Sequence, residues 1–162
     1  MGGLLVGWSD SVPQPAEPAI SRVNRFNAFS RGETYVQFYR KEAMSGIFFD
    51  PELGPGTGLP YGCGEDTDFL LQILASNQPV RRTNEVLVYH PKPNLTDPAL
   101  LKKTAAYACG RMCLLKKHNF PLWFKLANVA FPLIKALQEG SPALSYRRAM
   151  FLGRLKGLCK LK

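Results

Sequence analysis

The sequence predicts an α/β fold in which a few strands come first and amphipathic helices follow. Segments with strand-like composition are found at residues 4–8, 33–39, 80–83 and 85–89. Longer segments with helical spacing of apolar residues follow at residues 100–118, 120–140 and 145–161. The chain has 162 residues, 46% of them hydrophobic, which is enough for one modest core and favours one domain or a piece of one.

The first 50 residues predict strands separated by loops. Residues 4–8, LLVGW, form a short apolar run typical of a buried strand, and the proline-rich residues 9–19 predict an exposed loop. Residues 33–39 have the β-branched and aromatic content of a strand, and residues 40–44 are expected to turn into a short helix. A chain that opens on a buried strand and a long loop is expected to begin inside a domain.

A glycine-rich segment leads into a short acidic cluster. Residues 54–64, GPGTGLPYGCG, hold five glycines and two prolines, which excludes a regular helix or strand. Leu59 and Tyr61 are available to anchor this segment, so we expect a shaped loop. Residues 65–68, EDTD, then begin an apolar helical run, and acidic residues in a first turn complement the helix dipole.

The second half of the chain predicts two more strands and three helices. The strands at 80–83 and 85–89 end directly before His90 and Pro91. The helix at 120–140 contains Pro132, where we expect a kink. The last helix alternates apolar residues with Arg147, Arg148, Arg154, Lys156 and Lys160. We therefore expect residues 98–162 to be a C-terminal helical extension and residues 1–97 to be a separate part.

Composition restricts the cellular setting and the partners. The net charge of +9 favours an anionic partner, such as a membrane surface, nucleic acid or a phosphorylated substrate. The four cysteines lack C-x-x-C spacing, and we interpret them as reduced, small buried hydrophobes of a cytosolic protein. The N-terminus does not resemble a signal peptide, and no apolar run reaches the roughly 18 to 20 residues that span a bilayer.

The acidic cluster has two interpretations. Glu65, Asp66 and Asp68 can simply cap a helix and offset its dipole. Alternatively, one carboxylate accepts a proton from a bound hydroxyl while a neighbour orients that substrate. The preceding glycines favour the second interpretation, because they let a backbone approach a ligand and offer N–H groups to phosphate or sugar oxygens. The candidate substrate-binding glycines are Gly56, Gly58, Gly62 and Gly64.

His90 is the candidate metal ligand. It follows a strand and precedes a proline, which fixes its backbone at a sheet edge where open α/β folds place ligands. Neutral imidazole binds Mn²⁺ or a similar ion alongside carboxylates. A lone histidine is more often structural, so its position alone decides little.

Four segments follow one another in the sequence: FFDPELGPGT, GCGEDTDFLLQIL, VLVYHP and a closing GRLKG. In this order they make the chain similar to the C-terminal half of family 2 glycosyltransferases of the GT-A fold. The resemblance covers roughly residues 33–157. It implies a partial GT-A-like mixed sheet, with residues 1–97 as the acceptor-side half of the domain. It also identifies Gly64-Glu65-Asp66 with the family's xED motif, which implies that Asp66 is the catalytic base and Glu65 its helper. By the same resemblance, Asp68 is either an acceptor contact or a helix cap, and His90 contributes to the metal and diphosphate site.

The implied reaction is sugar transfer with inversion by a hexosyltransferase-type enzyme. A sugar or lipid-linked acceptor attacks a nucleotide-sugar donor, and a divalent metal, Mg²⁺ or Mn²⁺, neutralises the departing diphosphate. A complete enzyme of this kind also has a nucleotide-binding βαβ half with a DxD motif, and Asp10 has no second carboxylate two residues away. We therefore expect most metal ligands in a missing N-terminal half, and no activity from this chain alone.

The basic C-terminal helices leave three interpretations. They can pack on the catalytic part and expose a solvated basic face, or they can lie on an anionic membrane as an interfacial amphipathic region. Nucleic-acid binding is the least favoured, because no reader motif accompanies the charges. The alternative to an enzyme is thus a non-catalytic membrane-surface or protein-interaction module. The expected location is the cytoplasm, either free or peripheral at the inner face of the plasma membrane.

Overall fold

The computed structural model describes residues 3–9, 20–30, 37–54, 57–59, 61–89, 97–139 and 143–160. The fold is mixed α/β, as the sequence predicts, and it divides into two compact units. Residues 1–50 and 65–92 form the sheet unit, and residues 51–64 and 93–162 form the helical unit. This division differs from the one expected at residue 97, because residues 51–64 belong with the helices.

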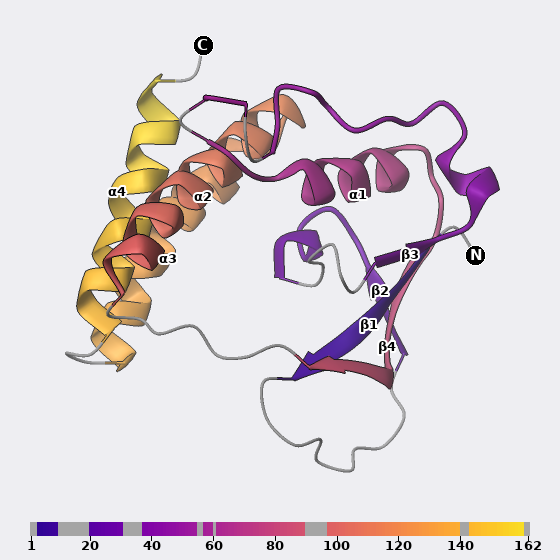
Figure 1. The fold of residues 1–162 in the computed structure, drawn as a ribbon, viewed down its shortest axis with the longest axis horizontal. Helices are drawn as coiled ribbons and strands as arrows, with labels where there is room; N and C mark the ends of the chain where they lie inside the picture. Colours follow the sequence, from indigo (N-terminus) through magenta and orange to yellow (C-terminus); the bar gives the residue numbers. More distant parts are fainter. Residues whose placement is uncertain are drawn as a thin grey trace. The chain divides into compact units, whose positions relative to one another are not determined.

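The sheet unit contains one mixed four-stranded sheet (Figure 1). Its strands are β1 (Gly3–Ser9), β2 (Ile20–Val23), β3 (Gln37–Tyr39) and β4 (Val80–Tyr89), in the order β2-β4-β1-β3. The central strands β1 and β4 are parallel, and the outer strands β2 and β3 pair with them antiparallel. Parallel neighbours end at the same edge, so Ser9 and Tyr89 lie opposite each other.

Two details of the sheet differ from the sequence prediction. Residues 80–89 form one strand, not two, and its pairing with β1 shifts register between Val6 and Gly7. Strand β2 was not predicted, because only Val23 of its four residues is buried. Strand β3 is described only over Gln37–Tyr39, the end of the predicted strand. The predicted loop at residues 10–19 lies outside the described residues.

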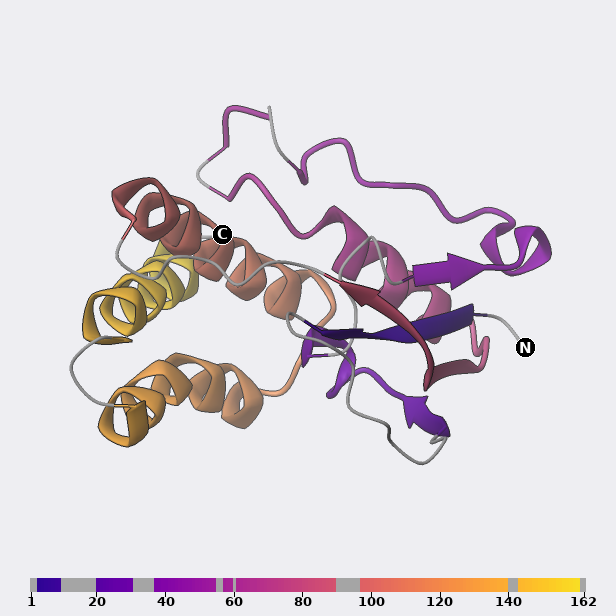
Figure 2. The same cartoon turned by 60° about the horizontal axis from the view of Figure 1, so that its bottom comes forward.

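One face of the sheet is covered by helix α1 (Glu65–Ala75), which lies over the strands in Figure 2. The ring of Phe69 on α1 stacks on Phe49 at 4.6 Å and meets Tyr39 of β3 edge-on at 5.3 Å. Val80 shares a row across the sheet with Tyr39 and Val23, and both valines are buried. This row and the apolar side of α1 make the core of the unit.

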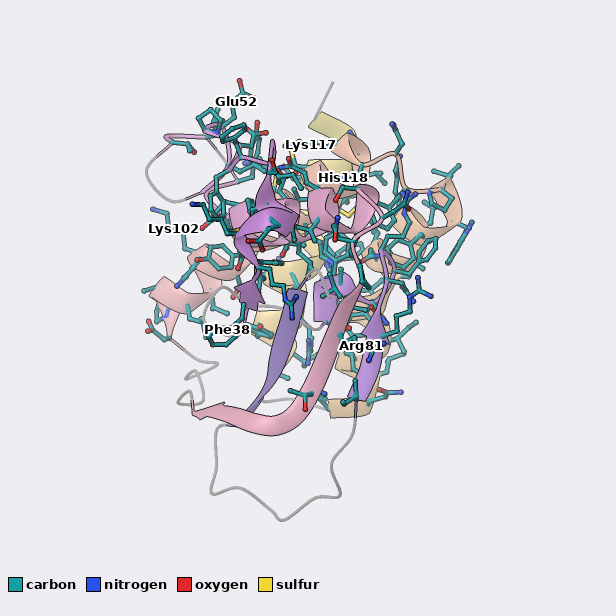
Figure 3. The ribbon with its side chains drawn as sticks, turned by 90° about the vertical axis from the view of Figure 1, so that its right-hand side faces the viewer. Phe38, Glu52, Arg81, Lys102, Lys117 and His118 are labelled. Carbon is teal, nitrogen blue, oxygen red and sulfur yellow. The ribbon has the colours of Figure 1, made fainter. Side chains whose placement is uncertain are left out.

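Side chains in the neighbouring row of the sheet are exposed. Arg22 lies opposite Arg81 on adjacent strands, and Phe38 occupies the same row on β3. Figure 3 labels Phe38 and Arg81 among the strand side chains. Successive strand residues point to opposite faces, so this row lies on the face away from α1. The described residues of the unit also include two short 3₁₀ helices, η1 (Ala28–Ser30) and η3 (Lys41–Met44), and the second is the short helix predicted at residues 40–44.

The helical unit consists of α2 (Pro98–Lys117), α3 (Leu122–Glu139) and α4 (Leu144–Lys160), close to the predicted bounds. Helix α4 packs against both α2 and α3. Asp97 begins α2 by accepting a hydrogen bond from the Ala99 N–H at 2.8 Å. None of the described helices is long and apolar enough to cross a membrane.

Two glycines let α4 approach α2 closely. A Cβ atom at Gly153 would lie 2.8 Å from Cβ of Ala108 and would collide with the carbonyl oxygen of Ala105. A Cβ atom at Gly157 would lie 2.7 Å from the carbonyl oxygen of Cys109. The sequence GRLKG therefore serves helix packing, since only glycine fits at both contacts.

A buried polar cluster joins α3 and α4 where Pro132 interrupts the backbone hydrogen bonds of α3. Proline has no N–H, so the carbonyl of Asn128, four residues earlier, loses its helical donor. The guanidinium of Arg154, with 3% of its surface exposed, donates to that carbonyl. The helix thus continues through Pro132 with its freed carbonyl satisfied.

Arg154 therefore does not belong to a solvated basic face, as the alternation of charges suggested. Burial, and then the charge of Arg147, lower the pKa of Arg154 to about 10, which still leaves it charged at neutral pH. Arg111 of α2 donates through Nε to Oδ1 of Asn128 at 2.7 Å, and burial lowers its pKa to about 9. Arg147 is engaged as well, in an ion pair with Glu139 at 2.6 Å.

The cysteines follow the prediction only in part. All four are free, in agreement with the expected reduced state. Cys109 is buried between helices, where a small apolar side chain fits. Cys63 and Cys113 are half-buried and Cys159 is exposed, so the expectation that all four are buried is wrong.

Candidate functional site

The acidic motif lies at the first turn of α1, as predicted. Oδ1 of Asp66 accepts a hydrogen bond from the Thr67 N–H at 2.7 Å and is 3.4 Å from the Thr67 hydroxyl. After Ala75 only residues 76–79 precede β4, so α1 folds back along the sheet in the opposite sense to β4 (Figure 1). Its N-terminus therefore points toward the side at which β1 and β4 end. This is the side on which open α/β sheets bind ligands.

Glu65 carries an unsatisfied oxygen. Its Oε2 atom is buried and has no hydrogen-bond partner among the described residues. A buried carboxylate oxygen without a partner is unfavourable, because it has lost its water without gaining a donor. Glu65 thus offers a hydrogen-bond acceptor that a ligand hydroxyl or amide could satisfy.

Tyr39 is an additional residue near this carboxylate pair that sequence reasoning missed. Burial, and then the negative charge of Asp66, hold its pKa well above the usual value for a phenol. Its hydroxyl donates to Oε1 of Gln37 at 2.7 Å. The phenol is therefore neutral and remains a hydrogen-bond donor at physiological pH. Nothing in the local sequence distinguishes Tyr39 from an ordinary strand tyrosine.

Asp68, predicted as either an acceptor contact or a helix cap, lies in the interior of the sheet unit. It is fully buried, and its Oδ2 accepts a hydrogen bond from Nε2 of Gln72 at 2.7 Å, one turn later in α1. The same Gln72 amide donates to the backbone carbonyl of Phe48 at 3.1 Å. Asp68 therefore orients a side chain that ties the segment before residue 50 to α1, and it is not accessible to a sugar in this structure.

The glycine-rich segment is a shaped loop within the helical unit. Gly58 has φ +71° and Gly64 has φ +106°, backbone conformations that favour glycine. A Cβ atom at Gly110 of α2 would lie 2.9 Å from Sγ of Cys63, so the loop packs closely on α2. Tyr61 anchors the loop as predicted, whereas Leu59 is 39% exposed and does not. Gly62 lies in the same irregular stretch, and Gly56 lies outside the described residues.

The described residues do not assemble a metal site. Among them, no three His, Cys, Asp or Glu side chains converge closely enough to hold an ion. His90, the predicted ligand, lies outside the described residues.

A surface pocket of about 550 Å³ lies elsewhere in the sheet unit. Its lining comes from β2, β4 and the turn before β4, with Ile20, Arg22, Pro79, Val80 and Arg81. None of these residues belongs to the acidic motif. The pocket therefore does not identify the place where Glu65 and Asp66 would meet a substrate.

No protein-family model, curated protein or solved structure matches the chain in comparisons with known proteins.

Proposed function

We propose that this chain is the acceptor-side half of an inverting, GT-A-type glycosyltransferase of family 2, with Asp66 as the catalytic base. The observation that carries the proposal is the pairing of Glu65 and Asp66 at the start of α1, next in sequence to the left-handed Gly64. Both carboxylates are only half-buried, in contrast to the fully buried Asp68. A motif that only capped the helix would not need Glu65 to keep a buried oxygen unpaired.

The chain's own residues can divide the work between them. Glu65 accepts a hydrogen bond from an acceptor hydroxyl and so holds that acceptor at the helix start. Asp66 takes the proton of the attacking hydroxyl.

The reaction is a single displacement. The acceptor oxygen forms a bond to the anomeric carbon as the bond from that carbon to the nucleoside diphosphate breaks. The electron pair leaves with the diphosphate, and the acceptor proton passes to Asp66. One displacement inverts the anomeric configuration and needs no enzyme nucleophile. The nucleotide-sugar donor and the metal belong, in this proposal, to an N-terminal half that completes the domain.

The test is sugar transfer by the protein translated from its entire reading frame, with a panel of nucleotide sugars and either Mg²⁺ or Mn²⁺. We expect Asp66→Asn to lower the turnover rate by about 100-fold to 10,000-fold, because it removes the proton acceptor and keeps the hydrogen bond from Thr67. Asp97→Asn is the matched control, since Asp97 also accepts a backbone hydrogen bond at a helix start. Donor binding should be unchanged in both variants.

Two results would contradict the proposal. If no nucleotide sugar is turned over by the unmodified protein, the chain does not belong to a transferase. If turnover occurs and Asp66→Asn leaves it at the level of Asp97→Asn, the acidic motif has no catalytic role.

A further inference from the structure

Helix α3 exposes a continuous apolar surface. Its exposed apolar residues are Leu122, Trp123, Leu126, Ala127, Ala130, Phe131, Leu133, Ile134 and Leu137. At 100° per residue these nine positions cover about half of the helix circumference. The only polar residue inside that arc is Gln138. We call this surface the apolar face of α3.

The apolar face contacts α4 at its border, where the guanidinium of Arg154 lies 5.6 Å from the centre of the Phe131 ring, but the buried residues of α3 lie elsewhere. The opposite side of the helix carries the buried Asn128 and Pro132, and there Asn128 meets Arg154 of α4. Side chains on the apolar face are open to solvent, with Leu137 89% exposed and Trp123 63% exposed. An exposed apolar surface of this extent on a folded helix indicates an interaction site.

The charge around this face identifies its occupant. At 100° per residue, Lys125 and Lys135 lie about 60° and 40° beyond its two borders on the helix circumference, and both are half-buried with stems that can extend toward a surface. The helical unit as a whole carries thirteen Lys and Arg against three Asp and Glu, a net charge of +10. On α3 itself the only carboxylate is Glu139, which is paired with Arg147.

We propose that the apolar face of α3 lies in the interface of an anionic phospholipid membrane, parallel to its plane. Leucine, isoleucine and aromatic side chains insert among the acyl chains, and Trp123 sits at the level of the headgroups. Lys125 and Lys135 extend to the lipid phosphates, and the positive field of the unit attracts the anionic surface. An apolar half-circumference bordered by lysine and free of acidic groups fits a lipid interface better than the mixed polar rim of a protein partner.

The test is co-sedimentation of the full chain with vesicles of phosphatidylcholine alone or of phosphatidylcholine mixed with phosphatidylglycerol. We expect binding to the mixed vesicles, weaker binding at high salt, and little binding to the neutral ones. Ile134→Glu should lower the partition coefficient about tenfold or more, because it places a charge in the apolar face. The matched control is Ile20→Glu in the sheet unit, an isoleucine that is 61% exposed against 53% for Ile134.

Circular dichroism must show that both variants keep their helices, and Leu126→Glu is a second probe of the same face. Equal partitioning of Ile134→Glu and Ile20→Glu would overturn the proposal. A second result would also overturn it: the chain does not bind vesicles, and it forms dimers that Ile134→Glu disperses. The occupant of the apolar face would then be a second copy of the chain. The inference does not depend on sugar transfer, since vesicle binding needs no donor or acceptor.

Discussion

The sheet unit and the helical unit differ most in their charge. The sheet unit has eight Lys and Arg against nine Asp and Glu, a net charge of −1, whereas the helical unit has a net charge of +10. The acidic residues Glu65 and Asp66 belong to the nearly neutral unit, and the apolar face of α3 belongs to the basic one. Under the two proposals this difference corresponds to a division of work, with chemistry in one unit and attachment to an anionic surface in the other.

The two units also differ in how they are held together. In the sheet unit aromatic rings of Tyr39, Phe49 and Phe69 pack between strand and helix. In the helical unit Gly153 and Gly157 allow close helix contact, and Arg154 satisfies a carbonyl that Pro132 leaves open. Substitutions should therefore affect the two units through different physical causes.

The largest effect is expected from Gly153→Val. The new side chain would collide with the backbone of Ala105 and force α4 away from α2. Overpacking of this kind costs about 3 kcal/mol or more of unfolding free energy when a backbone atom is the obstacle. Urea unfolding measures it, and Leu152→Val at a half-exposed position of α4 is the control. Equal stability of the two variants would show that the helices are not in close contact.

A smaller effect is expected from Arg154→Met. It leaves the Asn128 carbonyl without a donor, which costs about 2 kcal/mol. Pro132→Ala returns a backbone N–H to α3, so the same arginine change should cost about 1 kcal/mol less in that background. A double-mutant cycle by urea unfolding measures this coupling. Additive changes would mean that Arg154 does not replace the helical hydrogen bond.

An effect confined to the sheet unit is expected at alkaline pH. The folded unit raises the pKa of Tyr39 above the usual 10.0, so the folded state holds this proton more tightly than the unfolded state. Its contribution to stability is complete below pH 10 and falls by up to about 1.4 kcal/mol per pH unit above it. Tyr39→Phe should remove part of the alkaline loss in urea unfolding, and Tyr107→Phe in the helical unit should not. Identical pH profiles would rule out the buried phenol as a cause.

The smallest effect is expected from Arg147→Gln. The guanidinium of Arg147 makes two hydrogen bonds to Glu139, of 2.8 and 2.6 Å, between partly exposed side chains. Pairs of this kind contribute less than about 1 kcal/mol. A loss above that value in thermal unfolding would show that the pair holds the end of α3 against α4 more strongly than its exposure indicates.

The helices could be predicted because their apolar residues recur with helical spacing over 17 to 20 residues. Strand β2 could not, since three of its four side chains are exposed and its partner β4 is far along the chain. The polar Asn84 separates two apolar segments and therefore suggested two strands. In the structure β4 continues through Asn84, and its pairing with β1 shifts register there. Local composition does not reveal such pairing.

For the candidate site, the sequence located the acidic motif at a helix start, where Glu65 and Asp66 are found. It did not reveal that Asp68 is fully buried, although Gln72 at the i+4 position offered a local partner for Asp68. The burial of Arg154 was hidden because its alternation with apolar residues looks like any exposed basic face. Only the three-dimensional placement of the carbonyl that Pro132 leaves open reveals its role.

The central claim is that chemistry and surface attachment belong to different units, and one measurement tests it most directly. The rate of sugar transfer to a soluble acceptor is measured for the Asp66→Asn and Ile134→Glu variants. Both variants are made in the protein translated from its entire reading frame, and the unmodified protein is the reference. The account predicts a loss of about 100-fold or more for Asp66→Asn and a rate within about twofold of the unmodified protein for Ile134→Glu. A similar loss in both variants, or no loss in Asp66→Asn, would contradict it.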